Sequence, residues 1–79
     1  MQCDYIQTMI EQGLPDSQVS VTGDGRHFEA VVINDAFAGK GLLEQHRMVY
    51  ATLGDKMGGE IHALSMRTYT RAQWEKTGK

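Results

Sequence analysis

The segment from 37 to 64 constrains the fold most, because it joins a helical pattern to a strand pattern across a pair of glycines. Its first part reads FAGKGLLEQHRMVYATL, and after Gly58 and Gly59 the chain resumes with IHAL. The apolar residues at helical spacing are Leu42, Leu43, Val49, Tyr50, Leu53 and Met57. They predict a helix over 42–57 that ends at Gly58, and the run after it predicts a strand over 61–69. The helix has the length of a right-handed crossover, which makes the strands on either side of it parallel if they are neighbours in one sheet.

The other elements are shorter, and turn residues separate them. The full set is a helix over 4–12, strands over 17–22 and 28–33, a helix over 42–57, a strand over 61–69 and a short helix from Thr70. Gly13 and Pro15 stop the first helix, and a turn at 23–25 joins the first two strands into a hairpin. This order indicates an α+β fold. Tyr50 and Trp74 are expected to be apolar anchors, with Trp74 closing the last helix against the sheet.

Length and composition indicate one ordered domain over residues 1–79. The formal net charge of -2 gives no general attraction to nucleic acid or to an anionic membrane. The N-terminal region has no secretion signal pattern and no run of apolar residues is long enough for a membrane span, so we expect a cytoplasmic protein. Cys3 has no second cysteine to pair with, which fits a reducing compartment. No serine lies in a GxSxG motif and no catalytic carboxylate pair can be inferred, so we predict no enzymatic activity.

Two histidines stand where neighbouring strands are expected to begin. His27 directly precedes the strand over 28–33, and His62 lies at the start of the strand over 61–69. Parallel strands begin at the same edge of a sheet, about 4.8 Å apart, so the two imidazoles could share a metal centre. The alternative is a solvated His27 and a half-buried His62 bonded to backbone, and spacing alone favours it. Two histidines are also an incomplete ligand set, since tetrahedral zinc or an iron-sulfur cluster usually needs four ligands.

Two blocks of the chain resemble the BolA-like family. The first block comprises Phe37, Gly39, Lys40, Leu43, His46, Arg47, Val49, Tyr50 and Leu53, and the second is IHALSMRTYTRAQW. The similarity covers nearly the whole chain, and its brevity and its ending resemble the IbaG/YrbA branch. The resemblance implies a class II KH-like fold, αββαβ(α), with a three-stranded mixed sheet covered by helices. The chain departs from the family pattern at Gln45, where arginine is frequent, at Gly41, where serine is common, and at Arg71, where proline often opens the last helix.

The resemblance also implies a role in iron-sulfur cluster trafficking or iron homeostasis. Members of the family form heterodimers with monothiol glutaredoxins of the CGFS type, and the two proteins hold a bridging [2Fe-2S] cluster. His62 matches the C-terminal histidine of the family, and His27 matches a histidine or cysteine that varies in the loop before the second strand. The partner's cysteine and its glutathione would complete the four ligands.

Nucleic-acid binding is the alternative function, since KH-like folds bind single strands and the family has been linked to transcriptional control. Lys40, Arg47 and Arg67 could supply positive charge, and the amides near Gly39 and Gly41 could approach a phosphate. The turn has no GxxG motif, however, and a glycine-rich turn with ordinary solvated charges explains the same residues. A homodimer also remains open.

Overall fold

The computed structural model describes residues 3–24, 27–54 and 63–78, and it confirms the predicted α+β order. The elements are α1 (Cys3–Gly13), β1 (Gln18–Gly23), β2 (His27–Ile33), the short 3-10 helix η1 (Asp35–Phe37), α2 (Leu42–Leu53), β3 (Ala63–Tyr69), α3 (Arg71–Gln73) and its π-helical continuation η3 (Trp74–Gly78). The strands form one sheet in the order β1-β2-β3. β1 pairs with β2 antiparallel and β2 with β3 parallel, so the predicted crossover through α2 is correct.

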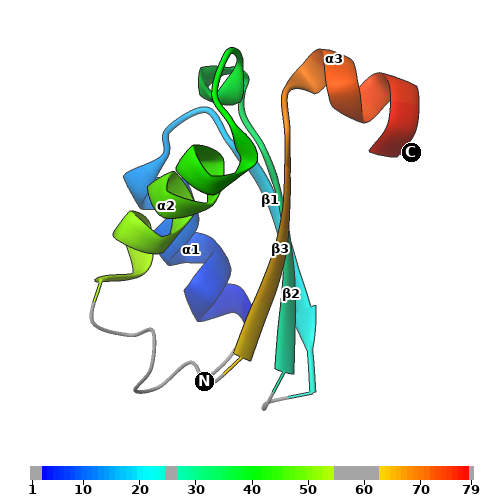
Figure 1. Cartoon of the computed structure of the whole chain (residues 1–79). Coiled ribbons are helices and arrows are strands. Elements are labelled where there is room, and N and C mark those ends of the chain that lie inside the picture. Colours follow the sequence, from blue (N-terminus) through cyan, green and yellow to red (C-terminus); the bar gives the residue numbers. More distant parts are fainter. Residues whose placement is uncertain (1–2, 25–26, 55–62, 79) are drawn as a thin grey trace.

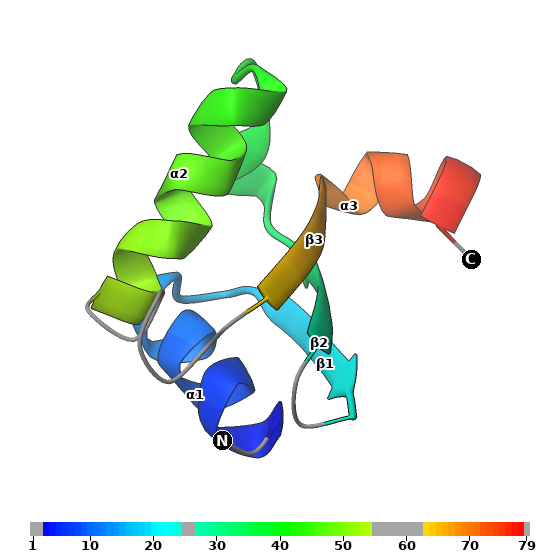
Figure 2. The same ribbon diagram turned by 60° about the horizontal axis from the view of Figure 1, so that its bottom comes forward.

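The helices lie on both sides of the sheet, but unequally. Helices α1 and α2 form a layer against one face, and α3 projects from the end of β3 on the opposite side (Figures 1 and 2). The side chains that alternate toward α1 and α2 build the core with residues of those helices and of η1. The buried core comprises Ile6, Ile10, Val19, Val21, Phe28, Ala30, Val32, Phe37, Val49, Leu53 and Met66. The other face of the strands carries mostly exposed side chains. No helix among the described residues is long and apolar enough to cross a membrane.

Helix α2 differs from its prediction in length and in orientation. It ends at Leu53 because Gly54 adopts a positive φ of 55°, so the predicted end at Gly58 is wrong. Leu42 and Leu43 are 65% and 66% exposed, and Tyr50 is 39% exposed, so Tyr50 is not the buried anchor that the spacing predicted. The buried residues are Gln45, Val49 and Leu53, which lie four apart along one face.

Gln45 is buried because its amide joins three parts of the chain. Its Nε2 donates hydrogen bonds to the carbonyl oxygens of Phe37, at 3.2 Å, and of Lys40, at 2.8 Å. Its Oε1 accepts a hydrogen bond from the hydroxyl of Thr68 in β3. The side chain therefore fixes the turn before α2 and ties α2 to the edge strand.

A second polar contact positions α3. The Arg71 amide donates to Asp35 Oδ1 at 3.0 Å, and its guanidinium donates to Asp35 Oδ2 at 3.2 Å and to the carbonyl of Asp16 at 2.6 Å. Thr70 caps the helix in a capping box with Gln73. The ring of Trp74 then meets Tyr69 edge to face, with 5.3 Å between ring centroids. Trp74 therefore contacts the sheet through Tyr69, and it also lines a hollow with Val31 and Ile33.

Replacement of Gln45 by alanine is expected to lower the free energy of unfolding by about 1–3 kcal/mol, because two carbonyls and a hydroxyl lose their partner in a partly dry site. Chemical denaturation followed by circular dichroism measures the change. The matched control is Glu44→Ala, one residue away, which removes only an exposed ion pair with Lys40 at 3.5 Å and should change stability by less than about 0.5 kcal/mol. Equal effects of the two substitutions would contradict a structural role for Gln45.

The contact between Asp35 and Arg71 is expected to stabilise the folded state by an amount that depends on pH. The hydrogen bond from the Arg71 amide, and then its side chain and charge, lowers the pKa of Asp35 below its ordinary value of 3.8. The folded state then gains stability above that value and loses it as the pH falls through the folded pKa. Asp35→Asn should therefore melt below the wild type at neutral pH, and the gap should close in strong acid. Thermal melts across the acid range measure the difference in melting temperature between the two proteins. A difference that does not change with pH would refute the role of the ionised Asp35 side chain.

Candidate metal-ligand site at the edge of the sheet

His27 lies at the first position of β2, and its side chain is exposed. Its backbone is held by a reciprocal pair of hydrogen bonds across the hairpin turn. The His27 amide donates to Asp24 Oδ1 at 2.9 Å, and the Asp24 amide donates to the His27 carbonyl at 3.2 Å. The turn therefore fixes where the strand starts while the imidazole remains in contact with solvent.

The register of the parallel pair places Ala63, which follows the second candidate in the sequence, beside His27. His27 is the partner of Ala63 in β3, and Ala63 directly follows His62 in the sequence. The prediction that β2 and β3 begin at one edge is thus correct for the described backbone. His62 itself lies outside the described residues. Its predicted role as a ligand, and that of His27, therefore remain predictions.

Of the two candidate histidines at this edge, the structure describes His27. Among the described ranges, no three side chains of histidine, cysteine, aspartate or glutamate come together in a way that could hold a metal ion. An exposed imidazole at the rim of a sheet is accessible to a partner protein and can donate one nitrogen. Cys3 is half-buried and packs against the core.

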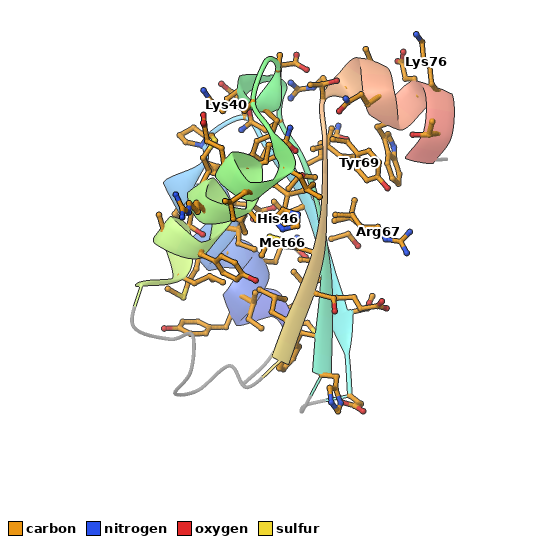
Figure 3. The ribbon with its side chains drawn as sticks, in the orientation of Figure 1. Lys40, His46, Met66, Arg67, Tyr69 and Lys76 are labelled. Atoms are coloured by element: carbon orange, nitrogen blue, oxygen red, sulfur yellow. The ribbon has the colours of Figure 1, made fainter. Side chains whose placement is uncertain are left out.

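The three basic residues of the alternative function do not form one surface. Lys40 is half-buried before α2 and pairs with Glu44, and Arg47 is exposed on α2. Arg67 lies on the opposite face of the sheet, away from the two helices (Figure 3). The alternation along β3, where Met66 points into the core, is the sequence signal that could have separated Arg67 from the other two.

The third histidine has a packing position. His46 points from α2 toward Met66 of β3 (Figure 3), and its Nε2 is buried without a hydrogen-bond partner among the described residues. Of the two histidines that the structure describes, His46 is half-buried and His27 is exposed. His46 is therefore a natural control for experiments on the other two histidines.

The comparison with family models decides the family of the chain. The model described as BolA-like protein matches residues 9–73, which is most of the sequence. The chain belongs to the BolA-like family.

Over its full length the chain is 31% identical to the acid stress protein IbaG of Escherichia coli, and the match covers 95% of that protein, which confirms the expected IbaG/YrbA branch. It is also 42% identical over 53 residues to the DNA-binding transcriptional regulator BolA of Escherichia coli, and this match spans 67% of the chain and half the length of that relative. These names describe a stress protein and a regulator, not enzymes.

Solved structures confirm the BolA-like fold. A BolA homologue from Coxiella burnetii is 47% identical, with a TM-score of 0.87 over 95% of this chain and 97% of that one. Yeast Fra2 is 32% identical, with a TM-score of 0.77 over 98% of this chain and 87% of that one. The candidate ligand His27 therefore lies at the start of the central strand of a BolA-like mixed sheet.

The turn that carries His27 predicts a steric requirement at Gly23. A Cβ atom there would lie 2.5 Å from the His27 carbonyl oxygen and 2.7 Å from the Phe28 ring. Gly23→Ala should therefore lower the free energy of unfolding by about 1–3 kcal/mol, as overpacking does elsewhere. Gly41→Ala is the control, since nothing lies within 4 Å of a Cβ at that position. Denaturant titration measures both, and a Gly23→Ala variant as stable as Gly41→Ala would show that the turn is not close-packed.

Proposed function

We propose that this chain is an adaptor in iron-sulfur cluster trafficking or iron homeostasis that binds a monothiol CGFS glutaredoxin. His62 and His27 would co-ligate a bridging [2Fe-2S] cluster, and the partner's cysteine and glutathione would supply the other ligands. The observation that carries the proposal is the register, which pairs His27 with the residue directly after His62. Strand spacing of about 4.8 Å supports this proposal, because two imidazoles at the start of adjacent parallel strands would be close enough for one small metal centre.

The chemistry of the edge supports the same proposal. An iron-sulfur cluster of this kind needs four ligands, and imidazole can replace thiolate on one iron. A chain that offers two histidines therefore needs a partner with two further ligands, as a CGFS glutaredoxin with glutathione has. Membership of the BolA-like family and the likeness to yeast Fra2 support a partner-dependent role. The exposure of His27 leaves its imidazole accessible to such a partner.

A KH-like nucleic-acid-binding regulator is the second candidate, and the relative named as a DNA-binding transcriptional regulator favours it. The positions of the basic residues do not favour nucleic-acid binding, because Arg67 lies on the other side of the sheet from Lys40 and Arg47. Phosphate contacts by a connected basic surface would make the affinity fall steeply with added salt. Binding to single-stranded DNA that is undetectable even at low salt would remove this candidate.

The decisive experiment is anaerobic reconstitution of a cluster on a CGFS glutaredoxin, with and without this protein, followed by visible absorption and circular dichroism. We expect a new spectrum in the mixture, and His62→Ala should abolish it. His27→Ala should weaken or alter it, because that substitution removes the second nitrogen of the proposed ligand pair. Visible absorption and circular dichroism both change when a ligand of the cluster changes.

His46→Ala is the matched control, because it removes the one remaining histidine from a position between α2 and the sheet. It should leave the spectrum of the mixed cluster unchanged, provided that far-ultraviolet circular dichroism reports a folded chain. A glutaredoxin spectrum that does not change on addition of the wild-type protein would refute the adaptor proposal. A new spectrum that survives His62→Ala would refute the ligand assignment alone.

A further inference from the structure

The sheet face opposite α1 and α2 has a regular arrangement that follows from the strand registers. Three rows of side chains cross the strands, each with one residue from β1, β2 and β3. The rows are Thr22–Glu29–Ser65, Ser20–Val31–Arg67 and Gln18–Ile33–Tyr69. Because all nine positions alternate with the core residues of their strands, they lie on the same face.

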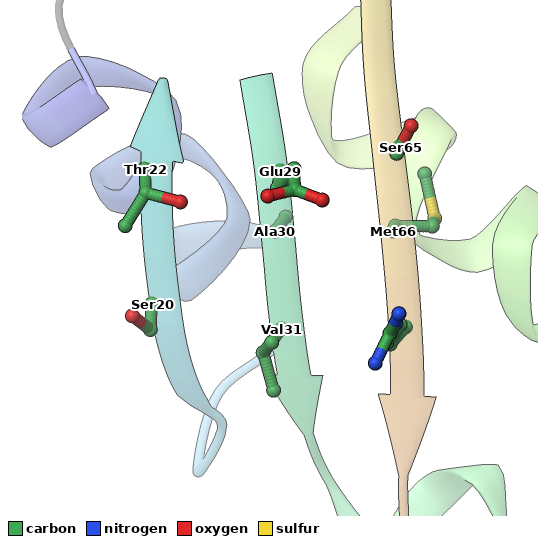
Figure 4. A pocket seen from close by; sticks show the side chains of 8 residues that line it. Ser20, Thr22, Glu29, Ala30, Val31, Ser65 and Met66 are labelled. Carbon is green, nitrogen blue, oxygen red and sulfur yellow. The ribbon is translucent and has the colours of Figure 1, made fainter.

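Trp74, the first residue of η3, lies over the last of these rows and borders the middle one, because the hollow that it lines also includes Ser20 and Val31. Trp74 contacts Tyr69 and lines a hollow with Gln18 and Ile33, and Ile33 is only 5% exposed as a result. The row Thr22–Glu29–Ser65 and the side chain of Arg67 have no covering element in the described part of the chain. We call the six residues of the first two rows the open patch: Ser20, Thr22, Glu29, Val31, Ser65 and Arg67. They line a shallow hollow of about 490 Å³, and Figure 4 shows Glu29 between Thr22 and Ser65.

An uncovered face is unusual for strands that pair in parallel. Parallel sheets are normally buried on both faces, whereas antiparallel ones commonly leave one face to water. β2 and β3 are parallel, and among the described residues α1 and α2 cover one side of them, whereas on the other side only Trp74 borders the open patch, at one end. Val31 lies at the centre of that patch, half-buried between Ser20 and Arg67. A second layer of protein over these strands would complete the arrangement that parallel pairing favours.

The charges of the open patch indicate what that layer is. Glu29 and Arg67 are both exposed, and neither forms an ion pair or a hydrogen bond among the described residues. They lie one strand apart and two residues apart along the strands, roughly 8 Å between Cα atoms from ordinary strand spacing and rise. The remaining side chains are small or uncharged. The patch therefore presents one negative and one positive charge side by side.

We propose that the open patch is the surface through which two copies of this chain associate about a two-fold axis. An axis parallel to the face of the patch, midway between Glu29 and Arg67 and perpendicular to the line that joins them, exchanges their two positions. Glu29 of each copy then faces Arg67 of the other, so a single rotation forms two opposite-charge contacts. Such an interface uses the same surface on both copies, as two-fold dimers do. Ser20, Thr22 and Ser65 are short enough for the two sheets to pack at about 10 Å.

The size of the patch sets the strength of this association. A stable interface buries roughly 800 Å² on each partner. Two rows on three strands provide less than that, even with the neighbouring ring of Trp74. The dimer is therefore weak and reversible, and it forms as the protein concentration rises. This inference does not depend on the cluster or on a glutaredoxin.

The test is sedimentation velocity and two-dimensional NMR of the full chain over a range of concentrations, with a reductant so that Cys3 cannot form an intermolecular disulfide. Trp74, the single tryptophan of the chain, adds a fluorescence signal at the end of the patch. The wild type should dimerise with rising concentration. Glu29→Arg alone and Arg67→Glu alone should each weaken self-association by about tenfold or more, because every contact then joins like charges.

Mixing the two single variants is the decisive step. In an equimolar mixture, each mixed pair again has two opposite-charge contacts, so association should recover to about the wild-type level. The double variant Glu29→Arg with Arg67→Glu should also associate with itself. Arg47→Glu is the matched control, since it makes the same charge change on α2, in the layer on the other side of the sheet. It should leave self-association unchanged.

Three outcomes would overturn the proposal, provided that circular dichroism reports folded variants. One is a wild type that stays monomeric at every concentration, which would leave the patch to solvent or to another partner. The second is single variants that associate as the wild type does. The third is a mixture that associates no better than its separate components, which would exclude the exchange of Glu29 and Arg67 between copies. Recovery in the mixture, together with an unaffected Arg47→Glu variant, would support the proposal.

Discussion

The parallel pairing of β2 with β3 is the interaction on which the other features of this chain depend. It runs from His27 and Ala63 to Ile33 and Tyr69, with α2 as the crossover between the strands. The backbone hydrogen bonds of this pairing start both described strands at one edge, with His27 beside Ala63. The same register aligns the side chains of the open face into rows. A shift by one residue would turn every side chain of β3 to the other face and remove both surfaces.

Two polar contacts hold the crossover in place near its start and near the end of β3. Gln45 joins the turn before α2 to Thr68, and Arg71 joins the start of α3 to Asp35. Gln45 and Arg71 are both at positions where the resemblance to the family led us to expect another residue. Arg71 has a backbone N–H that proline lacks, and that N–H is the donor to Asp35. A departure that removes a preorganised helix start therefore adds a hydrogen bond between distant segments.

The sequence was sufficient to predict the element order, the parallel crossover and the cap at Thr70, because periodicity and turn residues are local signals. It was not sufficient to predict which face of α2 is buried. Leu42 and Leu43 look like core residues by hydrophobicity, yet Gln45 takes the buried position because three partners from the turn and β3 satisfy its amide. The periodicity of apolar residues along the helix does not predict such hydrogen bonds, because they depend on residues outside the helix. The end of α2 at Gly54 was missed for a similar reason, since Gly58 carries the same local signal.

The two proposed associations use neighbouring parts of the same surface. His27 is two residues before Glu29 in β2, so its side chain lies on the open face, one row beyond the open patch. A second copy placed over Glu29 and Arg67 would therefore come close to the edge where a glutaredoxin would dock. Self-association and cluster sharing would then compete for one face of the sheet. Because the self-contact is small and reversible, a partner that also gains metal–ligand bonds would displace the second copy.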